Sequence, residues 1–170
     1  DLKKNLSQSF IQNLIPLYIL CEVIKKKEKN IKIIYLSTAS LYANKIKLPA
    51  KESAKKELNN VYEFIKYLSE QILINSSNKY LNYQILRLSN VYGENISKKK
   101  QNNRQVLTKI ISDAFKKKKI KIFGSGNYIR DFIHVEDVCS SIYKIITKNN
   151  LKNEIFNIGS GKQHKLINIF

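Results

Sequence analysis

Two short, continuously apolar segments that alternate with helical ones constrain the fold of this chain most strongly. Residues 31–37 and 82–88 have the composition of buried strands, and each follows a stretch with helical periodicity. Continuous apolar strands that alternate with helices are typical of a parallel sheet whose two faces are both covered by helices. The sequence therefore predicts an α/β fold.

The same patterns assign the remaining elements. In the first predicted helix one apolar stripe runs along the face formed by Leu6, Phe10, Leu14, Leu17, Cys21 and Ile24. A polar loop over 44–60 precedes the second helix, and a glycine-containing turn is expected at 124–127. Helices are predicted over 2–29, 62–76, 105–118 and 136–147, and strands over 31–37, 82–88, 120–123, 131–135 and 155–158.

The charge of the chain first suggests a polyanionic partner. Its net charge is +18, from 31 Lys+Arg against 13 Asp+Glu, a balance found in proteins that bind nucleic acid or acidic membranes. Only Arg87, Arg104 and Arg130 are arginines, however, and the lysines are spread along the whole chain together with isoleucine and asparagine. We therefore interpret the lysines as a solvated compositional excess and expect no nucleic acid and no membrane as partner.

Signals of targeting, redox state and metal binding are few. The most apolar stretch, residues 10–23, is too short for a spanning helix, and no signal-peptide pattern is evident. Cys21 and Cys139 lie far apart and are interpreted as reduced packing residues. His134 and His164 have no ligand types at metal spacing, so no metal site is expected. We expect a cytoplasmic protein.

Three side chains near the start of the second helix could share one site. Tyr62 and Lys66 are four residues apart and lie on one helix face, so the ammonium is expected to lower the pKa of the phenol. Thr38 follows an apolar strand, at the sheet edge where ligands of α/β folds bind. In a lysine-rich chain the same spacing also arises by chance, which leaves open a core tyrosine beside a solvated lysine.

Five motifs then follow one another in an order that is informative as a whole. Together they resemble the NAD-dependent epimerase/dehydratase branch of the extended short-chain dehydrogenase/reductase superfamily, over nearly all of the chain. The motifs are Ser37-Thr38-Ala39-Ser40-Leu41-Tyr42, Tyr62-Glu63-Phe64-Ile65-Lys66, Arg87-Leu88-Ser89-Asn90-Val91-Tyr92-Gly93, Gly124-Ser125-Gly126-Asn127-Tyr128-Ile129-Arg130-Asp131-Phe132-Ile133-His134-Val135-Glu136-Asp137 and Phe156-Asn157-Ile158-Gly159-Ser160-Gly161.

This resemblance implies a Rossmann-like parallel sheet flanked by helices, followed by a small α/β substrate domain. Residues 1–90 would complete the NAD-binding domain and carry the catalytic motif, and residues 91–170 would form the substrate-binding domain. The sequence has five glycines and none in a G-x-x-G-x-x-G pattern, so the amino-terminal glycine-rich βαβ unit of the family is absent. We expect a fragment whose two ends are cut, which is inactive and does not bind NAD measurably by itself.

The resemblance also implies a cofactor and the residues that bind it. The cofactor would be NAD, with NADP possible. Tyr62 would act as the acid/base on a sugar hydroxyl, Lys66 would bind the nicotinamide ribose, and the Thr38 hydroxyl would assist Tyr62. Asn13 and Ser37 would complete the cofactor-binding set together with Tyr62 and Lys66. For Asn13 the alternative is an ordinary polar residue on a helix face. One departure from the family lies between Tyr62 and Lys66, where small residues are usual and this chain has Glu63-Phe64-Ile65.

The substrate site is implied in the same way. Ser40, Asn90 and Arg130 match positions that bind a nucleotide-sugar, the last two through its diphosphate. For Arg130 the alternative is a structural ion pair with Asp131 or Asp137.

The function expected from the resemblance is a nucleotide-sugar epimerase that transiently oxidises a sugar hydroxyl, with carbon 4 as the leading expectation, in surface-polysaccharide or sugar-nucleotide metabolism. A reductase of a keto-sugar or another carbonyl compound is the alternative enzyme, and an inactive scaffold or a basic binding protein is the non-enzymatic alternative. Dehydratases of this branch have Asp-Glu where this chain has Ala39-Ser40, so elimination of water is not expected. The full-length form is expected to be a homodimer.

Overall fold

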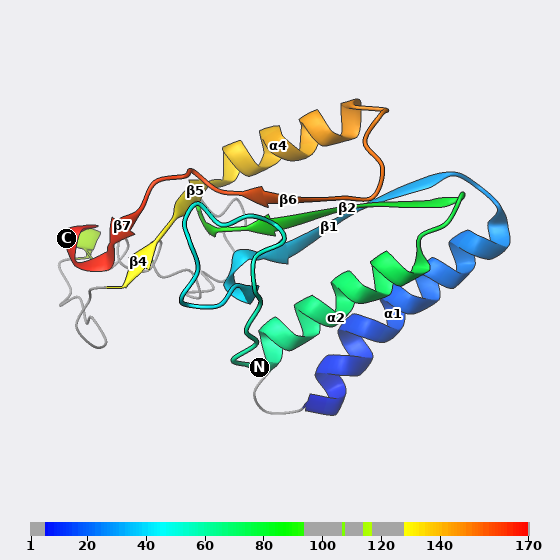
Figure 1. Ribbon diagram of the computed structural model, residues 1–170, viewed down its shortest axis with the longest axis horizontal. Helices are drawn as coiled ribbons and strands as arrows, with labels where there is room; N and C mark the ends of the chain where they lie inside the picture. Colours follow the sequence, from blue (N-terminus) through cyan, green and yellow to red (C-terminus); the bar gives the residue numbers. More distant parts are fainter. Residues whose placement is uncertain (1–5, 94–106, 108–113, 117–127, 170) are drawn as a thin grey trace. The chain divides into compact units, whose positions relative to one another are not determined.

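The computed structural model describes residues 6–93, 107, 114–116 and 128–169 (Figure 1). The chain divides into two compact units, residues 1–88 with 144–157 and residues 89–143 with 158–170. The predicted boundary at residue 90 lies close to the first crossing between the units. Residues 144–157, however, belong with the first unit, because the strand they contain joins its sheet. The functional assignment of each domain stays a prediction.

The first unit is built on a three-stranded sheet. Its strands are β1 (Ile31–Thr38), β2 (Leu81–Leu88) and β6 (Glu154–Ile158), in the order β1-β2-β6. β1 and β2 are parallel and in register along their whole length, from Ile31 opposite Leu81 to Thr38 opposite Leu88. The predicted strands over 31–37, 82–88 and 155–158 are thus confirmed, each extended by one residue. The α/β fold with a parallel sheet flanked by helices is confirmed as well.

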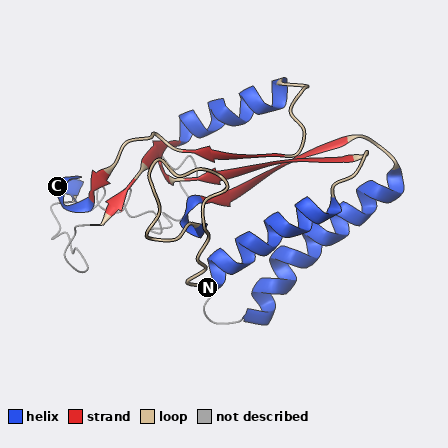
Figure 2. Ribbon diagram, viewed as in Figure 1, coloured by secondary structure: helices blue, strands red, loops and turns tan. Residues whose placement is uncertain are grey.

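Two helices lie side by side along one face of this sheet, as Figures 1 and 2 show. They are α1 (Leu6–Lys27) and α2 (Val61–Ser76). The predicted stripe of α1 does face the interior, since Leu14, Cys21 and Ile24 are buried and Phe10 and Leu17 are half-buried. The core between helices and sheet is formed by Cys21, Ile24, Leu73, Leu81, Tyr83 and Ile85.

The start of α2 is fixed by its own capping residues. The Asn60 side chain accepts a hydrogen bond from the Glu63 amide at 3.0 Å, and the Glu63 carboxylate accepts one from the Asn59 amide at 2.7 Å. Such reciprocal bonds satisfy backbone donors that a helix start otherwise leaves unpaired. They explain why the helix begins at Val61 and therefore why Tyr62 lies in its first turn.

The second unit contains short strands. β3 (Asn90–Tyr92) pairs in parallel with β5 (Phe132–His134), and β4 (Ile129–Arg130) pairs antiparallel with β7 (His164–Lys165). A 3-10 helix, η2 (Leu166–Ile169), follows β7. The helix α4 (Val135–Thr147) begins in this unit and ends in the first. The predicted strand over 120–123 and turn at 124–127 lie outside the described residues, as does most of the predicted helix over 105–118.

Among the helices in the described part of the chain, none is long and apolar enough to cross a bilayer.

Candidate functional site

The candidate site forms where β1 and β2 end. Thr38 is the last residue of β1 and lies opposite Leu88, the last residue of β2, so both strands end at the same edge of the sheet. A single turn of 3-10 helix, η1 (Ala39–Leu41), follows at once. The Thr38 side chain caps this turn by accepting a hydrogen bond from the Ser40 amide at 3.2 Å. The strand end therefore presents Thr38 in a fixed position.

Ser40 lies beside Thr38. The two hydroxyl oxygens are 3.0 Å apart, and Ser40 is exposed. The structure therefore brings together two of the predicted site residues, one predicted to assist catalysis and one to bind substrate.

Tyr62 reaches the same strand end from the first turn of α2. Its phenol lies near the Thr38 side chain, and the residue is 41% exposed, so it can contact a ligand. Burial raises the pKa of the phenol above its ordinary value; the Thr38 side chain lowers that pKa in part, and the nearby Glu63 charge raises it further. The expectation that Lys66 lowers this pKa is therefore wrong for the described chain, where the phenol starts protonated.

Lys66 directs its ammonium toward β1 instead. Its Nζ donates a hydrogen bond of 2.7 Å to the carbonyl oxygen of Leu36 and lies 4.8 Å from the centre of the Tyr35 ring. Burial lowers the pKa of Lys66, and the charge of Glu70 opposes that effect. The ammonium is thus held close to the strand end, where it remains a donor.

The unusual residues between Tyr62 and Lys66 have structural roles. Glu63 caps the helix, Phe64 packs against Phe10 with ring centres 6.1 Å apart, and Ile65 is 3% exposed. These contacts hold the first turn of α2 in place. The larger side chains therefore do not displace Tyr62 and Lys66 from one helix face.

Two predicted cofactor-binding residues lie differently from expectation. The Ser37 side chain is buried and its hydroxyl donates a 2.5 Å hydrogen bond to Glu70, because successive strand residues point to opposite faces and Thr38 takes the other one. A role for Ser37 in cofactor binding is thereby limited to its backbone. Asn13 is exposed on α1, and its side-chain amide donates to the Ser9 carbonyl one turn earlier at 2.7 Å. This local bond is what the alternative reading of a polar helix-face residue predicts.

The remaining predicted substrate residues belong to the second unit. The backbone and side-chain amides of Asn90 both donate to the Asp131 carbonyl, at 3.0 and 2.9 Å. The exposed Arg130 guanidinium donates to the Ile129 carbonyl at 2.9 Å and lies 5.8 Å from the centre of the Tyr128 ring. Within the described ranges no ion pair of Arg130 is found, so the structural alternative with Asp131 gains no support.

The Asp131 carboxylate binds the loop at Ser160 and Gly161. It accepts hydrogen bonds from the Ser160 amide at 2.9 Å, the Ser160 hydroxyl at 2.8 Å and the Gly161 amide at 2.9 Å. At Gly159 a Cβ atom would come within 2.6 Å of the same carboxylate, so only glycine fits. This bonded loop fixes Asp131 and, with it, the backbone that carries Arg130.

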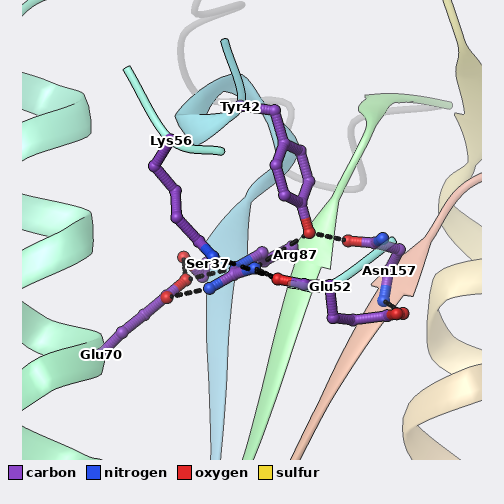
Figure 3. Close-up of polar contacts among 7 residues, drawn as sticks. All are labelled: Ser37, Tyr42, Glu52, Lys56, Glu70, Arg87 and Asn157. Carbon is purple, nitrogen blue, oxygen red and sulfur yellow. Dashed lines mark hydrogen bonds and ion pairs between the residues drawn. The ribbon is translucent and has the colours of Figure 1, made fainter. Parts of the chain in front are cut away.

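The sequence analysis did not predict a buried polar network that includes Ser37, the residue before Thr38 (Figure 3). Its centre is the ion pair of Arg87 on β2 with Glu70 on α2, whose side chains are 2% and 0% exposed. Two signals could have indicated it. Arg87 interrupts an otherwise apolar strand, and Glu70 continues the spacing of Tyr62 and Lys66 by four further residues on the same helix face.

In the described part of the chain no three His, Cys, Asp or Glu side chains are grouped so that they could hold a metal ion.

Comparison with known proteins identifies the family of the chain and its solved structural neighbours. Residues 5–159 match the model of the NAD dependent epimerase/dehydratase family. The ADP-L-glycero-D-manno-heptose-6-epimerase of Brachyspira hyodysenteriae is 32% identical over 151 residues, which cover 84% of this chain and 45% of that protein.

Among solved structures, the UDP-glucose 4-epimerase of Thermotoga maritima with UDP-glucose is 29% identical with a TM-score of 0.77, over 92% of this chain and 50% of that one. The UDP-glucuronic acid 4-epimerase of Bacillus cereus with UDP-glucuronic acid and NAD is 26% identical with a TM-score of 0.79, over 92% and 48% of the two chains. The chain thus spans about half the length of the relatives it matches.

Proposed function

Because the chain belongs to the NAD-dependent epimerase/dehydratase family, we propose that the protein containing it is a nucleotide-sugar epimerase that inverts a sugar hydroxyl, at carbon 4. The observation that carries the proposal is the meeting of Thr38 and Tyr62 at the end of β1, with the Lys66 ammonium held on the same strand end. A hydroxyl, a phenol and an ammonium are the groups needed to move a proton at an alcohol oxygen.

The donor set of this edge fits a dinucleotide. The Lys66 ammonium can donate to ribose hydroxyls, and the partly exposed Tyr62 phenol can donate or accept. NAD, when bound, accepts a hydride from the sugar and returns it. Lys66 would orient the ribose, and Tyr62 would bind beside it.

Proton transfer falls to Tyr62 and Thr38. Tyr62 would remove the hydroxyl proton as the hydride leaves carbon 4, and would return a proton when the hydride is delivered to the opposite face of the keto-sugar. A raised pKa makes the Tyr62 phenolate a stronger base for the first step, and the phenol so formed holds the proton that the second step returns. Before the first step the resting phenol must lose its own proton to solvent, which the Thr38 side chain favours because it lowers the pKa in part. Hydride and proton are both regained, so no net oxidation occurs.

Recognition of the substrate is proposed for the second unit. Arg130 is exposed, and its guanidinium makes only a local backbone bond and a ring contact among the described residues. Such a fork suits two phosphate oxygens of a nucleotide diphosphate. Asn90 would add an amide donor from β3.

The protein is further proposed to be a cytoplasmic homodimer. The two cysteines, Cys21 and Cys139, are free thiols, which suits a reducing compartment. The outward face of α1 exposes a run of large apolar side chains that a second copy would cover: Ile11, Ile15, Tyr18, Ile19, Leu20 and Val23. Sedimentation of the protein and of an Ile15→Glu variant would test this surface, and a variant that still sediments as a dimer would contradict it.

A labelled substrate tests the proposed reaction. UDP-glucose and UDP-glucuronic acid carrying deuterium at carbon 4 should each be tried with the whole protein, with no added reductant. The proposal expects the carbon 4 epimer to form with the deuterium retained at that carbon and without net change in NADH. In a parallel assay with added NADH and a keto-sugar, stoichiometric consumption of NADH, together with no epimer in the first assay, would instead identify a reductase. Absence of turnover on any nucleotide-sugar would contradict both enzymatic readings.

A further inference from the structure

The buried pair of Glu70 and Arg87 joins α2 to β2 with defined geometry. Arg87 Nε donates to Glu70 Oε1 at 3.0 Å and Arg87 Nη2 donates to Glu70 Oε2 at 2.6 Å. Two parallel bonds between planar groups fix both their distance and their relative orientation. The helix is thereby prevented from sliding or rotating over the strand at this point.

Glu70 is bound from the neighbouring strand as well. The Ser37 hydroxyl donates to Glu70 Oε1, and Ser37 lies directly opposite Arg87 in the β1–β2 register. Ser37 also immediately precedes Thr38. One carboxylate on α2 is thus bonded to adjacent strands, one residue before β1 ends at the candidate site (Figure 3).

The third nitrogen of the Arg87 guanidinium, Nη1, is bonded as well. It donates to the Tyr42 hydroxyl at 2.9 Å and to the Glu52 carbonyl at 2.8 Å. The Tyr42 hydroxyl in turn donates to Asn157 Oδ1 at 2.6 Å. The guanidinium is therefore held in place by the loop after β1 and cannot follow a movement of α2.

Glu70 lies on the same face of α2 as Tyr62 and Lys66. It lies four residues after Lys66 and eight after Tyr62, so the three side chains lie along one side of α2. A shift of the helix by one residue moves every side chain on it by about 1.5 Å along the axis. Any displacement at Glu70 would therefore be passed on to Tyr62 and Lys66.

Folding alone does not require such a pair. Apolar residues of similar size in place of a buried ion pair often leave stability unchanged or raise it. An apolar contact, however, does not fix the position of a helix along its axis relative to a strand as two parallel hydrogen bonds do. We propose that Glu70 and Arg87 are positioning residues that hold α2 at the position along its axis where Tyr62 lies near Thr38 and Lys66 bonds to the Leu36 carbonyl. The inference rests on the proposed function, since it names what that site needs.

The first test separates positioning from stability. The whole protein carrying Glu70→Leu together with Arg87→Met should stay folded at the assay temperature, with a lower melting temperature because Ser37, Tyr42 and the Glu52 carbonyl each lose a partner. We expect kcat to fall on the order of 100-fold for a displacement near 1 Å, while KM changes by less than about threefold. Where this pair does not fold, Arg87→Lys retains the charge but loses the fork. For it we expect roughly a tenfold fall in kcat at unchanged KM.

A matched control removes another buried polar group from the same strand. Gln84 on β2 is 0% exposed, and its Oε1 has no hydrogen-bond partner in the described structure. Gln84→Met should leave kcat unchanged. A stable double variant with the kcat of the parent, or an equal loss in Gln84→Met, would overturn the positioning role.

The second test does not depend on turnover. The pKa of Lys66 can be followed by NMR of 13C-methylated lysines, with the Lys66 signal identified by its loss in Lys66→Arg. Burial beside the Leu36 carbonyl lowers this pKa, so displacement of the ammonium should return it toward 10.5. The double variant also loses the Glu70 charge that raises this pKa, so the titration is carried out on Arg87→Lys, which keeps both charges. An unchanged Lys66 pKa in Arg87→Lys would overturn the inference. If the parent turns over no nucleotide-sugar, the proposed function fails while this titration still decides the positioning role.

Discussion

Lys66 and Leu36 are joined by a hydrogen bond of 2.7 Å, from the side-chain ammonium on α2 to the backbone carbonyl of β1. The bond ties the ammonium to the strand whose last residue is Thr38. A backbone acceptor cannot be removed by substitution of Leu36. The position of the ammonium therefore depends on the backbone of β1 and on the placement of α2.

Removal of the Lys66 ammonium should weaken NAD binding and lower turnover together. In the whole protein Lys66→Met should lower turnover on the order of 100-fold and weaken NAD binding by roughly tenfold, because a charge-assisted donor is lost. Lys79→Met removes the lysine that lies 4.7 Å from the Tyr80 ring, and serves as control. Kinetics and calorimetric titration with NAD would measure both effects. Unchanged NAD affinity would exclude Lys66 from the cofactor site.

Loss of the Tyr62 hydroxyl should lower turnover without changing the fold or NAD binding. Tyr62→Phe keeps the ring and its packing, so fold and NAD binding should be retained while turnover falls by on the order of 100-fold or more. Tyr67→Phe on the same helix provides the control. Steady-state assays of both variants decide the matter, and near-normal turnover in Tyr62→Phe would remove this residue from the mechanism.

Arg130 should discriminate a diphosphate clamp from a general basic surface. Arg130→Lys should weaken binding of the nucleotide-sugar by roughly 1.5 to 3 kcal/mol, because lysine keeps the charge but not the fork. The exposed Lys152 is the control, and Lys152→Ala should change little. Both variants would be titrated with a nucleotide-sugar and with a DNA duplex at two salt concentrations. Equal losses from the two substitutions, or tight salt-dependent binding to the duplex, would favour a basic binding protein.

Elimination of water is not expected at this site. Ala39 and Ser40 occupy the turn after Thr38, and neither side chain is a carboxylic acid that could protonate a leaving hydroxyl. The whole protein should therefore form no 4-keto-6-deoxy sugar from any nucleotide-glucose. Chromatography with mass detection of the loss of water would check this. A product lighter by one water would show that another residue supplies the acid.

Buried tyrosines should make the fold sensitive to alkali. Burial, with a further contribution from Glu154, raises the pKa of Tyr83 above 10.0. Above pH 10.0 the unfolded chain loses this proton while the folded chain keeps it, so stability falls as pH rises until the folded pKa is passed. Tyr83→Phe should flatten that fall in urea unfolding from neutral to alkaline pH. Lys56, whose pKa is lowered, acts in the opposite sense below 10.5, so parent and variant are compared at equal pH. Parallel curves would exclude Tyr83 as the cause.

The sequence predicted those parts of the fold that repeat a simple pattern. Strands β1 and β2 are continuous apolar runs, and the buried stripe of α1 has a clear helical period. Strands of two or three residues are too short to show any period. Of these, β5 lies within the strand predicted over 131–135, whereas β3, β4 and β7 were not predicted. The return of β6 to the first sheet depends on contacts between distant segments, which local patterns do not contain.

At the candidate site, the relative placement of Thr38, Tyr62 and Lys66 was more predictable than the environment of each side chain. Spacing brought Tyr62 and Lys66 onto one face of α2, and the end of an apolar strand placed Thr38 beside them. The direction of the Tyr62 pKa was not predictable, because it depends on burial and on where the Lys66 ammonium is bonded. The inward position of Ser37 follows from the alternation of side chains along β1, but its partner Glu70 comes near only in the folded chain.

The sheet order β1-β2-β6 also affects how the protein is made. Its third strand, Glu154–Ile158, is translated only after the whole segment 89–143 of the other unit. On the ribosome, α2 can pair Glu70 with Arg87 as soon as β2 has emerged. The Asn157 side chain that accepts from Tyr42 arrives much later. During synthesis the edge of β2 that β6 covers therefore stays unpaired until residue 158 leaves the exit tunnel.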